Sequence, residues 1–166
     1  MSYSPVLQAE GRDVSSLGPS ATQDKFNGAY TALLAHWFPG SRGYIVANQA
    51  LAPTGKYRSL MVRHGGHPCL EPVLIVAIKR PSKWTAAGRQ MVMDELADRI
   101  KRGFDHTQRN TIYGLGGIGL HWVVCKMTSK DDQPTLVLDW QDDIISDASY
   151  SRFEGVADLV YNIASE

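Results

Sequence analysis

The sequence predicts an α/β fold, a mixed β-sheet flanked by helices, and two patterns carry this prediction. Short segments rich in β-branched and aromatic residues, typical of strands, alternate with longer segments whose apolar residues recur at helical spacing. The chain between the third strand-like segment and the fourth is long enough for a right-handed crossover through a helix. A length of 166 residues and an apolar content of 43% fit one core that needs neither disulfides nor a metal.

The N-terminal residues 1–21 are rich in Ser, Gly and other polar side chains, so we expect a flexible leader there and a single domain over 22–166. A first helix should begin near Thr22, because apolar side chains then follow at helical spacing, and it should end at Pro39. The apolar positions of that helix are Phe26, Tyr30, Leu33 and Trp37.

Two short strands are expected at 43–47 and 57–62, separated by a turn at 53–55. The third strand, 73–79, is apolar on both faces, which is typical of a central strand. After Pro81, Ser82 should cap a long helix that ends at Gly103. The apolar stripe of this helix is predicted as Trp84, Ala87, Met91, Leu96 and Ile100.

Beyond that helix, we expect strands at 111–113, 120–127 and 135–140, with a glycine-rich turn at 114–119. A closing helix should be capped by Asp147. Its inward residues are predicted as Phe153, Val156, Leu159, Val160 and Ile163.

Charge and cysteine content limit the function classes. The chain has 17 Lys or Arg and 17 Asp or Glu, which argues against a strong nonspecific grip on nucleic acid. The charges are nevertheless divided, because residues 56–109 hold 11 basic and 5 acidic side chains and residues 110–166 hold 3 and 9. Cys69 and Cys125 are expected to be buried, reduced thiols. With no apolar run long enough to span a bilayer and no signal-like N-terminus, we expect an intracellular protein, cytoplasmic or nuclear, without a membrane partner.

The third strand carries the most specific pattern. Alternation places Ala77 and Lys79 on one face of the strand, and the helix that follows projects Gln90 from its early part. This arrangement resembles the PD-(D/E)XK, or restriction-endonuclease-like, nuclease superfamily over about residues 24–140. The glycine-rich run at 112–119 is similar to fungal members. The resemblance implies a restriction-endonuclease-like sandwich that cleaves nucleic-acid phosphodiesters, with Ala77, Lys79 and Gln90 at its catalytic positions.

The family motif is degenerate in this chain. The family carries Asp or Glu two residues before the lysine, and Ala77 stands in that place. A second carboxylate from the preceding strand is also missing, because no Asp or Glu occurs from Lys25 to Leu70, and Ser59 and Arg58 are poor ligands for a hard cation. We therefore expect no metal ligands as written, and Mg²⁺ or Mn²⁺ only if the acid site were intact.

Three hypotheses follow. The first is a nuclease-like protein, inactive or nearly so, that engages nucleic acid through Lys79 and the basic residues Arg80, Lys83 and Arg89. The second is a non-enzymatic interaction protein on the same fold, which pairs with itself as a homo-oligomer or with another chain. The third is an active nuclease whose acid is relocated to Asp24, Asp94 or Glu95. Lys79 is also compatible with an ordinary lysine that ends a strand and reaches solvent.

Three other motifs are weaker. The run Gly114 to Gly119 spells a dinucleotide fingerprint, but a strand follows it where the motif requires a helix. His64, His67 and Cys69 lack a fourth ligand for zinc. The acidic stretch at 139–143 is interpreted as a solvated strand exit.

Overall fold

The structure is a computed structural model that describes residues 1–50, 58–65 and 69–166. Within these residues, six strands form one sheet in chain order, and only β3 and β4 run parallel to each other as neighbours. The strands are β1 (Tyr44–Ala50), β2 (Arg58–His64), β3 (Glu71–Lys79), β4 (Ile112–Ile118), β5 (His121–Met127) and β6 (Thr135–Gln141).

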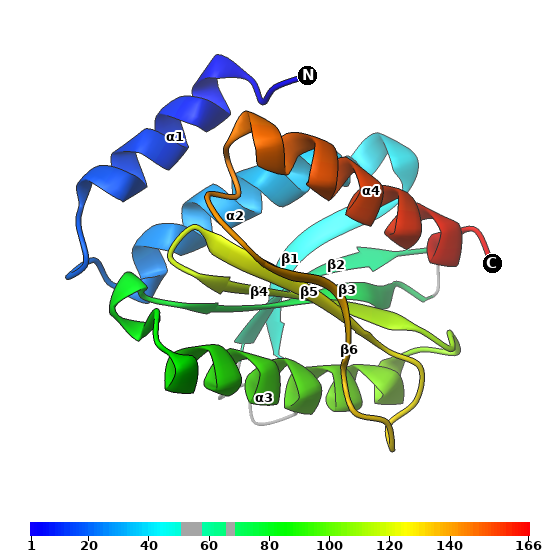
Figure 1. Cartoon of the computed structure of the whole chain (residues 1–166). Helices are drawn as coiled ribbons and strands as arrows, with labels where there is room; N and C mark the ends of the chain where they lie inside the picture. The colour runs from blue at the N-terminus through cyan, green and yellow to red at the C-terminus, as the bar shows by residue number, and fades with distance from the viewer. Residues whose placement is uncertain (51–57, 66–68) are drawn as a thin grey trace.

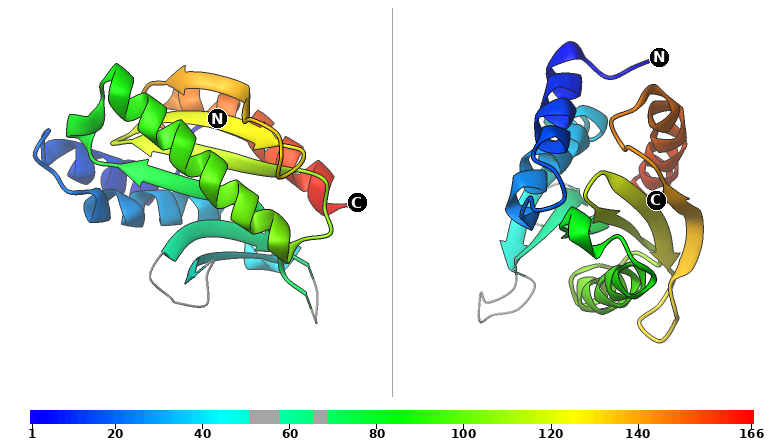
Figure 2. Two further views of the ribbon diagram at one scale, coloured as in Figure 1. Left: turned by 90° about the horizontal axis from the view of Figure 1, so that it is seen from below. Right: turned by 60° about the vertical axis from the view of Figure 1, so that its left-hand side comes forward.

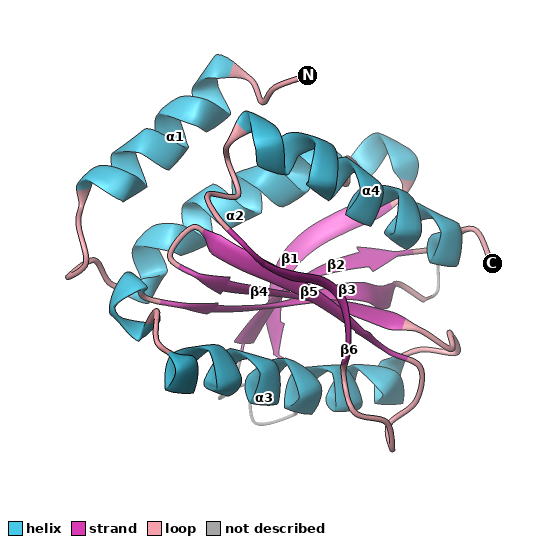
Figure 3. Ribbon diagram, in the orientation of Figure 1, coloured by secondary structure: helices cyan, strands magenta, loops and turns pink. Residues whose placement is uncertain are grey.

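Helices cover both faces of the sheet (Figure 1). α3 lies across one face and makes the crossover between β3 and β4, while α2 and α4 cover the opposite face and α1 packs outside α2 (Figures 2 and 3). The helices are α1 (Pro5–Ser16), α2 (Gln23–Trp37), α3 (Ala86–Gly103) and α4 (Asp147–Ala164), with short 3₁₀ turns η1 (Gly40–Arg42), η2 (Pro81–Lys83) and η3 (Phe104–His106). The predicted α/β fold with a mixed sheet flanked by helices is therefore confirmed. The predicted turn at 53–55 lies outside the described residues.

The expectation of a flexible leader over residues 1–21 is wrong for most of that segment. Ser4 caps α1, and its hydroxyl accepts a hydrogen bond from the Leu7 N–H. Tyr3, Leu7 and Val14 are buried against the main core. Of the residues of α1, Leu7, Gly11 and Val14 are buried, so the composition of this segment is mostly polar and did not indicate a helix. Packing against the rest of the protein stabilises it.

The start of α3 also differs from the prediction. Ser82 lies in η2, and the cap of α3 is Thr85, whose hydroxyl accepts from the Gly88 N–H at 2.9 Å. The buried stripe is shifted accordingly to Gly88, Val92, Leu96, Ile100 and Gly103. Trp84, Ala87 and Met91 are exposed, contrary to the predicted stripe. In α4, the cap is Ser146 rather than Asp147, and Leu159 is exposed, contrary to its predicted inward position.

The glycine-rich run is a strand and not the predicted turn, which is limited to Gly119 and Leu120 between β4 and β5. β4 is buried along its whole length. A Cβ on Gly116 would lie 2.5 Å from Cγ1 of Val92 on α3. These glycines let α3 approach the sheet closely, and no helix follows them to bind a pyrophosphate.

The two cysteines are free, as expected, but only Cys125 is buried, whereas Cys69 is exposed. Burial raises the pKa of the Cys125 thiol to about 12. We expect one thiol of the native protein to react quickly with Ellman's reagent at pH 8, and the second only in denaturant. Cys69→Ser should abolish the fast reaction. Two fast equivalents in the native protein would contradict the burial of Cys125.

Candidate functional site

Lys79 ends β3 at the sheet's parallel pair. The strand is buried from Pro72 to Ile78, and Lys79 lies opposite Ile118 of β4. The Lys79 carbonyl accepts a hydrogen bond from the Gly119 N–H at 2.9 Å, which fixes the end of the strand. Ala77 and Lys79 share the face of β3 that is covered by α3, as the alternation predicted.

The neighbouring strand β2 departs from β3 near this end. Residue-by-residue pairing extends from His64 and Glu71 to Met61 and Ile75 and stops there. Arg99 of α3 fills part of the opening, because its Nη1 donates to the Val76 carbonyl at 2.7 Å. A side chain from the helix thus satisfies a central-strand carbonyl where strand pairing has stopped.

Glu95 of α3 joins the two cations of this region. Its Oε2 lies 2.7 Å from the Lys79 Nζ, and its Oε1 is ion-paired with Arg99 one helical turn further on. All three side chains are partly buried, with Lys79 23% exposed. Two cations around one carboxylate leave a net charge of about +1 beside the end of β3. An anion such as a phosphate oxygen suits such a cluster.

The position that carries an acid in the resembled family is closed. Ala77 is fully buried in an apolar cluster with Val92 and Leu96 of α3. Ser59 is buried and supplies no carboxylate. The carboxylate that contacts Lys79, that of Glu95, has both oxygens engaged by cations. This arrangement does not fit Mg²⁺ or Mn²⁺, which require several free oxygen ligands.

The other predicted catalytic residue does not join this cluster. Gln90 is exposed on α3, and its Nε2 donates to Asp94 Oδ1 at 2.9 Å. Asp24, near the start of α2, is bonded by the Thr22 hydroxyl. Of the three carboxylates considered as relocated acids, Glu95 is therefore the one that contacts Lys79. Glu71 lies at the opposite end of β3 and pairs with Arg109.

The predicted nucleic-acid-binding residues surround the start of α3. Arg80 is exposed at the exit from β3, and Lys83 is partly exposed in η2. Arg89 holds its guanidinium 4.8 Å from the centre of the Trp84 ring. Lys79 contacts Glu95 and Arg89 contacts Trp84. The four basic residues therefore lie around the start of α3 and do not form one compact cluster.

Trp84 is a surface residue, contrary to the prediction that it packs in the core. It is 37% exposed and stacks on His121 with ring centres 3.8 Å apart and planes 7° apart. Trp140 meets it edge-on at 5.4 Å. The prediction failed because α3 begins after Trp84, so the helical phase assumed for the stripe does not apply to it.

Arg99 is the member of the cluster that sequence reasoning missed. Its spacing from Glu95, four residues along a helix, is a signal that could have indicated an ion pair. The Val76 carbonyl as its second partner depends on where β2 leaves β3, which no local pattern specifies.

Comparison of the chain with protein-family models, curated proteins and solved structures gives no match. In the part of the chain that the structure describes, no group of three or more His, Cys, Asp or Glu side chains could hold a metal ion. Nor is any helix of the described ranges long and apolar enough to cross a membrane.

Proposed function

We propose that this chain is a nuclease-like protein of the PD-(D/E)XK type, which binds nucleic-acid phosphates at the end of β3 and has lost most of its metal-dependent cleavage. The observation that carries the proposal is the Lys79–Glu95–Arg99 cluster at the end of a buried central strand. Arg80, which follows Lys79 in the chain, is exposed, and Lys83 of η2 is partly exposed. This combination offers a phosphate backbone several cations within one surface region.

The order of the elements supports the same proposal. The resemblance rests on the strand with Lys79, the helix that carries Gln90 and a following hairpin, and β3, α3 and the β4–β5 pair occur in that order. We therefore propose that this α/β fold with a mixed sheet is, more specifically, a restriction-endonuclease-like sandwich. The closed position at Ala77 and the engaged oxygens of Glu95 favour binding without efficient hydrolysis.

Fluorescence polarisation with labelled single-stranded and double-stranded DNA and RNA tests the proposal. We expect micromolar binding that weakens steeply as the salt concentration rises. Lys79→Met keeps the apolar stem and removes the charge, so it should weaken every complex and lower the salt slope by about 1. Lys130→Met is the matched control, since Lys130 pairs with Asp105 beyond the far end of α3 and should have no effect.

Glu95→Gln separates the roles of the carboxylate. If Glu95 only restrains the two cations, its neutralisation should tighten salt-sensitive binding about fivefold, the equivalent of about 1 kcal/mol. If Glu95 is instead the relocated acid of an active enzyme, the wild type should cleave nucleic acid with Mg²⁺ or Mn²⁺ and the variant should not. Absence of salt-sensitive binding to all four probes would refute the proposal.

The second candidate function is a non-enzymatic interaction protein on the same fold. One observation favours it: β6 is an outer strand of the sheet in which no residue is fully buried, and Leu136 is 51% exposed. A second copy of this chain could pair with that edge. Even weak self-association is populated at a protein concentration of about 100 μM. Light scattering that gives a monomer at this concentration would contradict it.

A further inference from the structure

A cavity of about 540 Å³ opens at the carboxyl ends of the parallel strands β3 and β4. Its walls include Pro81, just after β3, and Gly119, just after β4. In open α/β sheets, ligands bind at the carboxyl ends of parallel strands, and ligand pockets have volumes of roughly 300–1,000 Å³. The position and the volume of this cavity therefore suit a small group.

Aromatic side chains form one wall of the cavity. Trp84 and His121, stacked on each other, both line it, and the buried Phe26 of α2 lies at its inner side. Pro81 and Ile118 add further apolar surface. The Trp84 ring is covered by His121 and by the Arg89 guanidinium, so the surface left for stacking is the remaining face of His121, whose side chain is 35% exposed. Nucleic-acid bases stack on aromatic faces of this kind in proteins that bind single strands.

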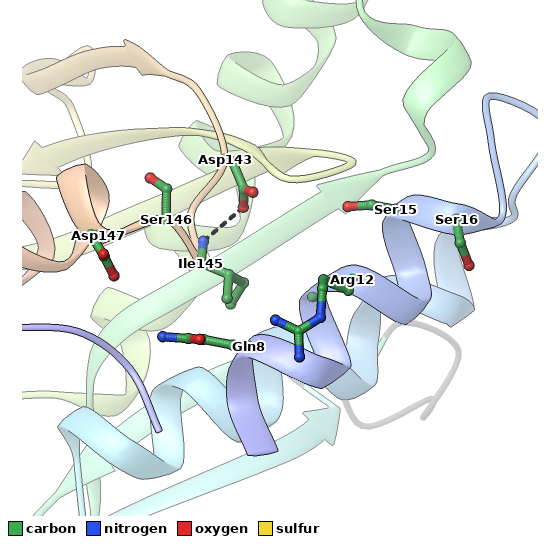
Figure 4. A pocket seen from close by; sticks show the side chains of 9 residues that line it. Gln8, Arg12, Ser15, Ser16, Asp143, Ile145, Ser146 and Asp147 are labelled. Atoms are coloured by element: carbon green, nitrogen blue, oxygen red, sulfur yellow. Dashed lines mark hydrogen bonds between the residues drawn. The ribbon is translucent and has the colours of Figure 1, made fainter. Parts of the chain in front are cut away.

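Two carboxylates give the cavity a polar end. Asp142 and Asp143, in the loop after β6, line it, and the Asp142 side chain is almost fully exposed. Asp143 Oδ1 accepts the Ile145 N–H at 2.9 Å, which orients this carboxylate (Figure 4). Carboxylates repel phosphate but accept hydrogen bonds from exocyclic amines such as cytosine N4.

A more polar pocket of about 670 Å³ lies beside α1 (Figure 4). Both hollows are lined by Ser15 and Asp143, so they share a border. Arg80, which directly precedes Pro81, is exposed at the same strand end. A nucleic-acid strand whose base enters the aromatic cavity therefore has the Arg80 guanidinium nearby for its phosphate.

We infer that this cavity binds an unpaired, amine-bearing nucleobase of a nucleic-acid strand, against the Trp84–His121 wall and with its amine toward Asp142 and Asp143. The inference rests on the proposed nucleic-acid binding and adds the group that is recognised. Adenine and cytosine carry such an amine, and thymine and uracil do not. Stacking of one base contributes about tenfold or more to affinity.

Polarisation titrations of the full chain with dC8, dA8, dT8 and an abasic 8-mer of equal charge test this inference. The abasic strand reports phosphate contacts alone. We expect dC8 and dA8 to bind about tenfold more tightly than the abasic strand, with dT8 between them. Trp84→Ala should reduce dC8 to the abasic affinity, whereas Met91→Ala, which removes another exposed apolar residue of α3, should leave the difference intact.

Two further variants leave the aromatic wall in place. Ser15→Phe, at an exposed position of α1, fills the cavity from its rim and should also abolish the advantage of dC8. Asp143→Asn keeps an oxygen for the Ile145 N–H and should equalise dC8 and dT8. Circular dichroism melts confirm that each variant is folded.

The outcomes separate this inference from the function on which it rests. Salt-sensitive binding with equal affinity for dC8 and the abasic strand would overturn the base site and leave the proposed function standing. A preference for dC8 that survives in folded Trp84→Ala and Ser15→Phe would also overturn it. Failure of single-stranded and double-stranded DNA and RNA alike to bind would refute the proposed function, and the base site with it.

Discussion

Ala77→Glu is expected to destabilise the protein and not to create a nuclease. The residue is fully buried beneath α3, where Val92 and Leu96 surround it. An introduced carboxylate would leave water for an apolar cluster, and the cations at this end of the strand already hold Glu95. We expect a loss of about 3–5 kcal/mol in the free energy of unfolding, a large part of the roughly 5–15 kcal/mol of an ordinary domain.

Ala77→Gln is the matched control, because it adds nearly the same volume without the charge. Burial would raise the pKa of the introduced carboxyl above its ordinary value of about 4.3. The charged form is then present in the unfolded chain and disfavoured in the folded one between these two pKa values, so its cost grows from about pH 4 upward. In urea titrations, the Glu variant should be less stable than the Gln variant at pH 7, and the two should converge as the pH falls to about 4.

The cleavage assay completes this experiment. We expect no Mg²⁺- or Mn²⁺-dependent cleavage by the Glu variant under conditions in which it remains folded. Wild-type stability together with new, metal-dependent cleavage would mean that residue 77 faces an otherwise complete metal site. The acid absent at position 77 would then be the one group that the site lacks for cleavage.

Much of the fold could be predicted from the sequence because its local signals agree. Period-two and continuous apolar runs mark the strands, and β3 is apolar on both faces since helices cover both. The crossover through α3 follows from the length between β3 and β4. Lys79 at the end of a central strand was therefore predictable, as was Glu95 as one of three acids within reach.

The surroundings of Lys79 were harder to predict because they depend on tertiary structure. Ser82 and Thr85 are both good cap residues, and the choice of Thr85 moves Trp84 from the helix to the surface. The cavity beside Trp84 combines residues from α1, α2 and four separate connections, and no local pattern specifies that assembly. Local periodicity predicts the elements, and packing decides which side chains meet.

The glycine run shows the same limit in the core. Six residues with four glycines are typical of a turn, yet Gly114 to Gly117 lie within β4. Helices pack against both faces of β4, and each face leaves room only for glycine at these positions. Gly116 faces Val92 of α3, and Gly117 faces Tyr30 of α2 on the opposite face of the sheet. The glycines therefore set how closely two helices approach the central strands.

Gly117→Ala should consequently be strongly destabilising. A Cβ at this position would lie 2.3 Å from the Tyr30 Oη and 2.7 Å from its Cζ. Tyr30 is fully buried, and its hydroxyl donates to the Gly119 carbonyl at 2.8 Å, so the ring cannot move aside without losing that bond. We expect a loss of about 3 kcal/mol, measured by urea or thermal unfolding, since overpacking and an unmade buried hydrogen bond act together.

A double-mutant cycle with Tyr30→Phe identifies the cause. Removing the hydroxyl removes the closest clash, so Gly117→Ala should cost at least about 1 kcal/mol less in the Phe background than in the wild type. Gly40→Ala is the matched control, because a Cβ added at Gly40 would meet no atom within 4 Å, and its effect should stay within about 0.5 kcal/mol. Equal costs of Gly117→Ala in the two backgrounds would show that Tyr30 does not limit this position. The close packing of α2 against β4 would then not explain the glycine.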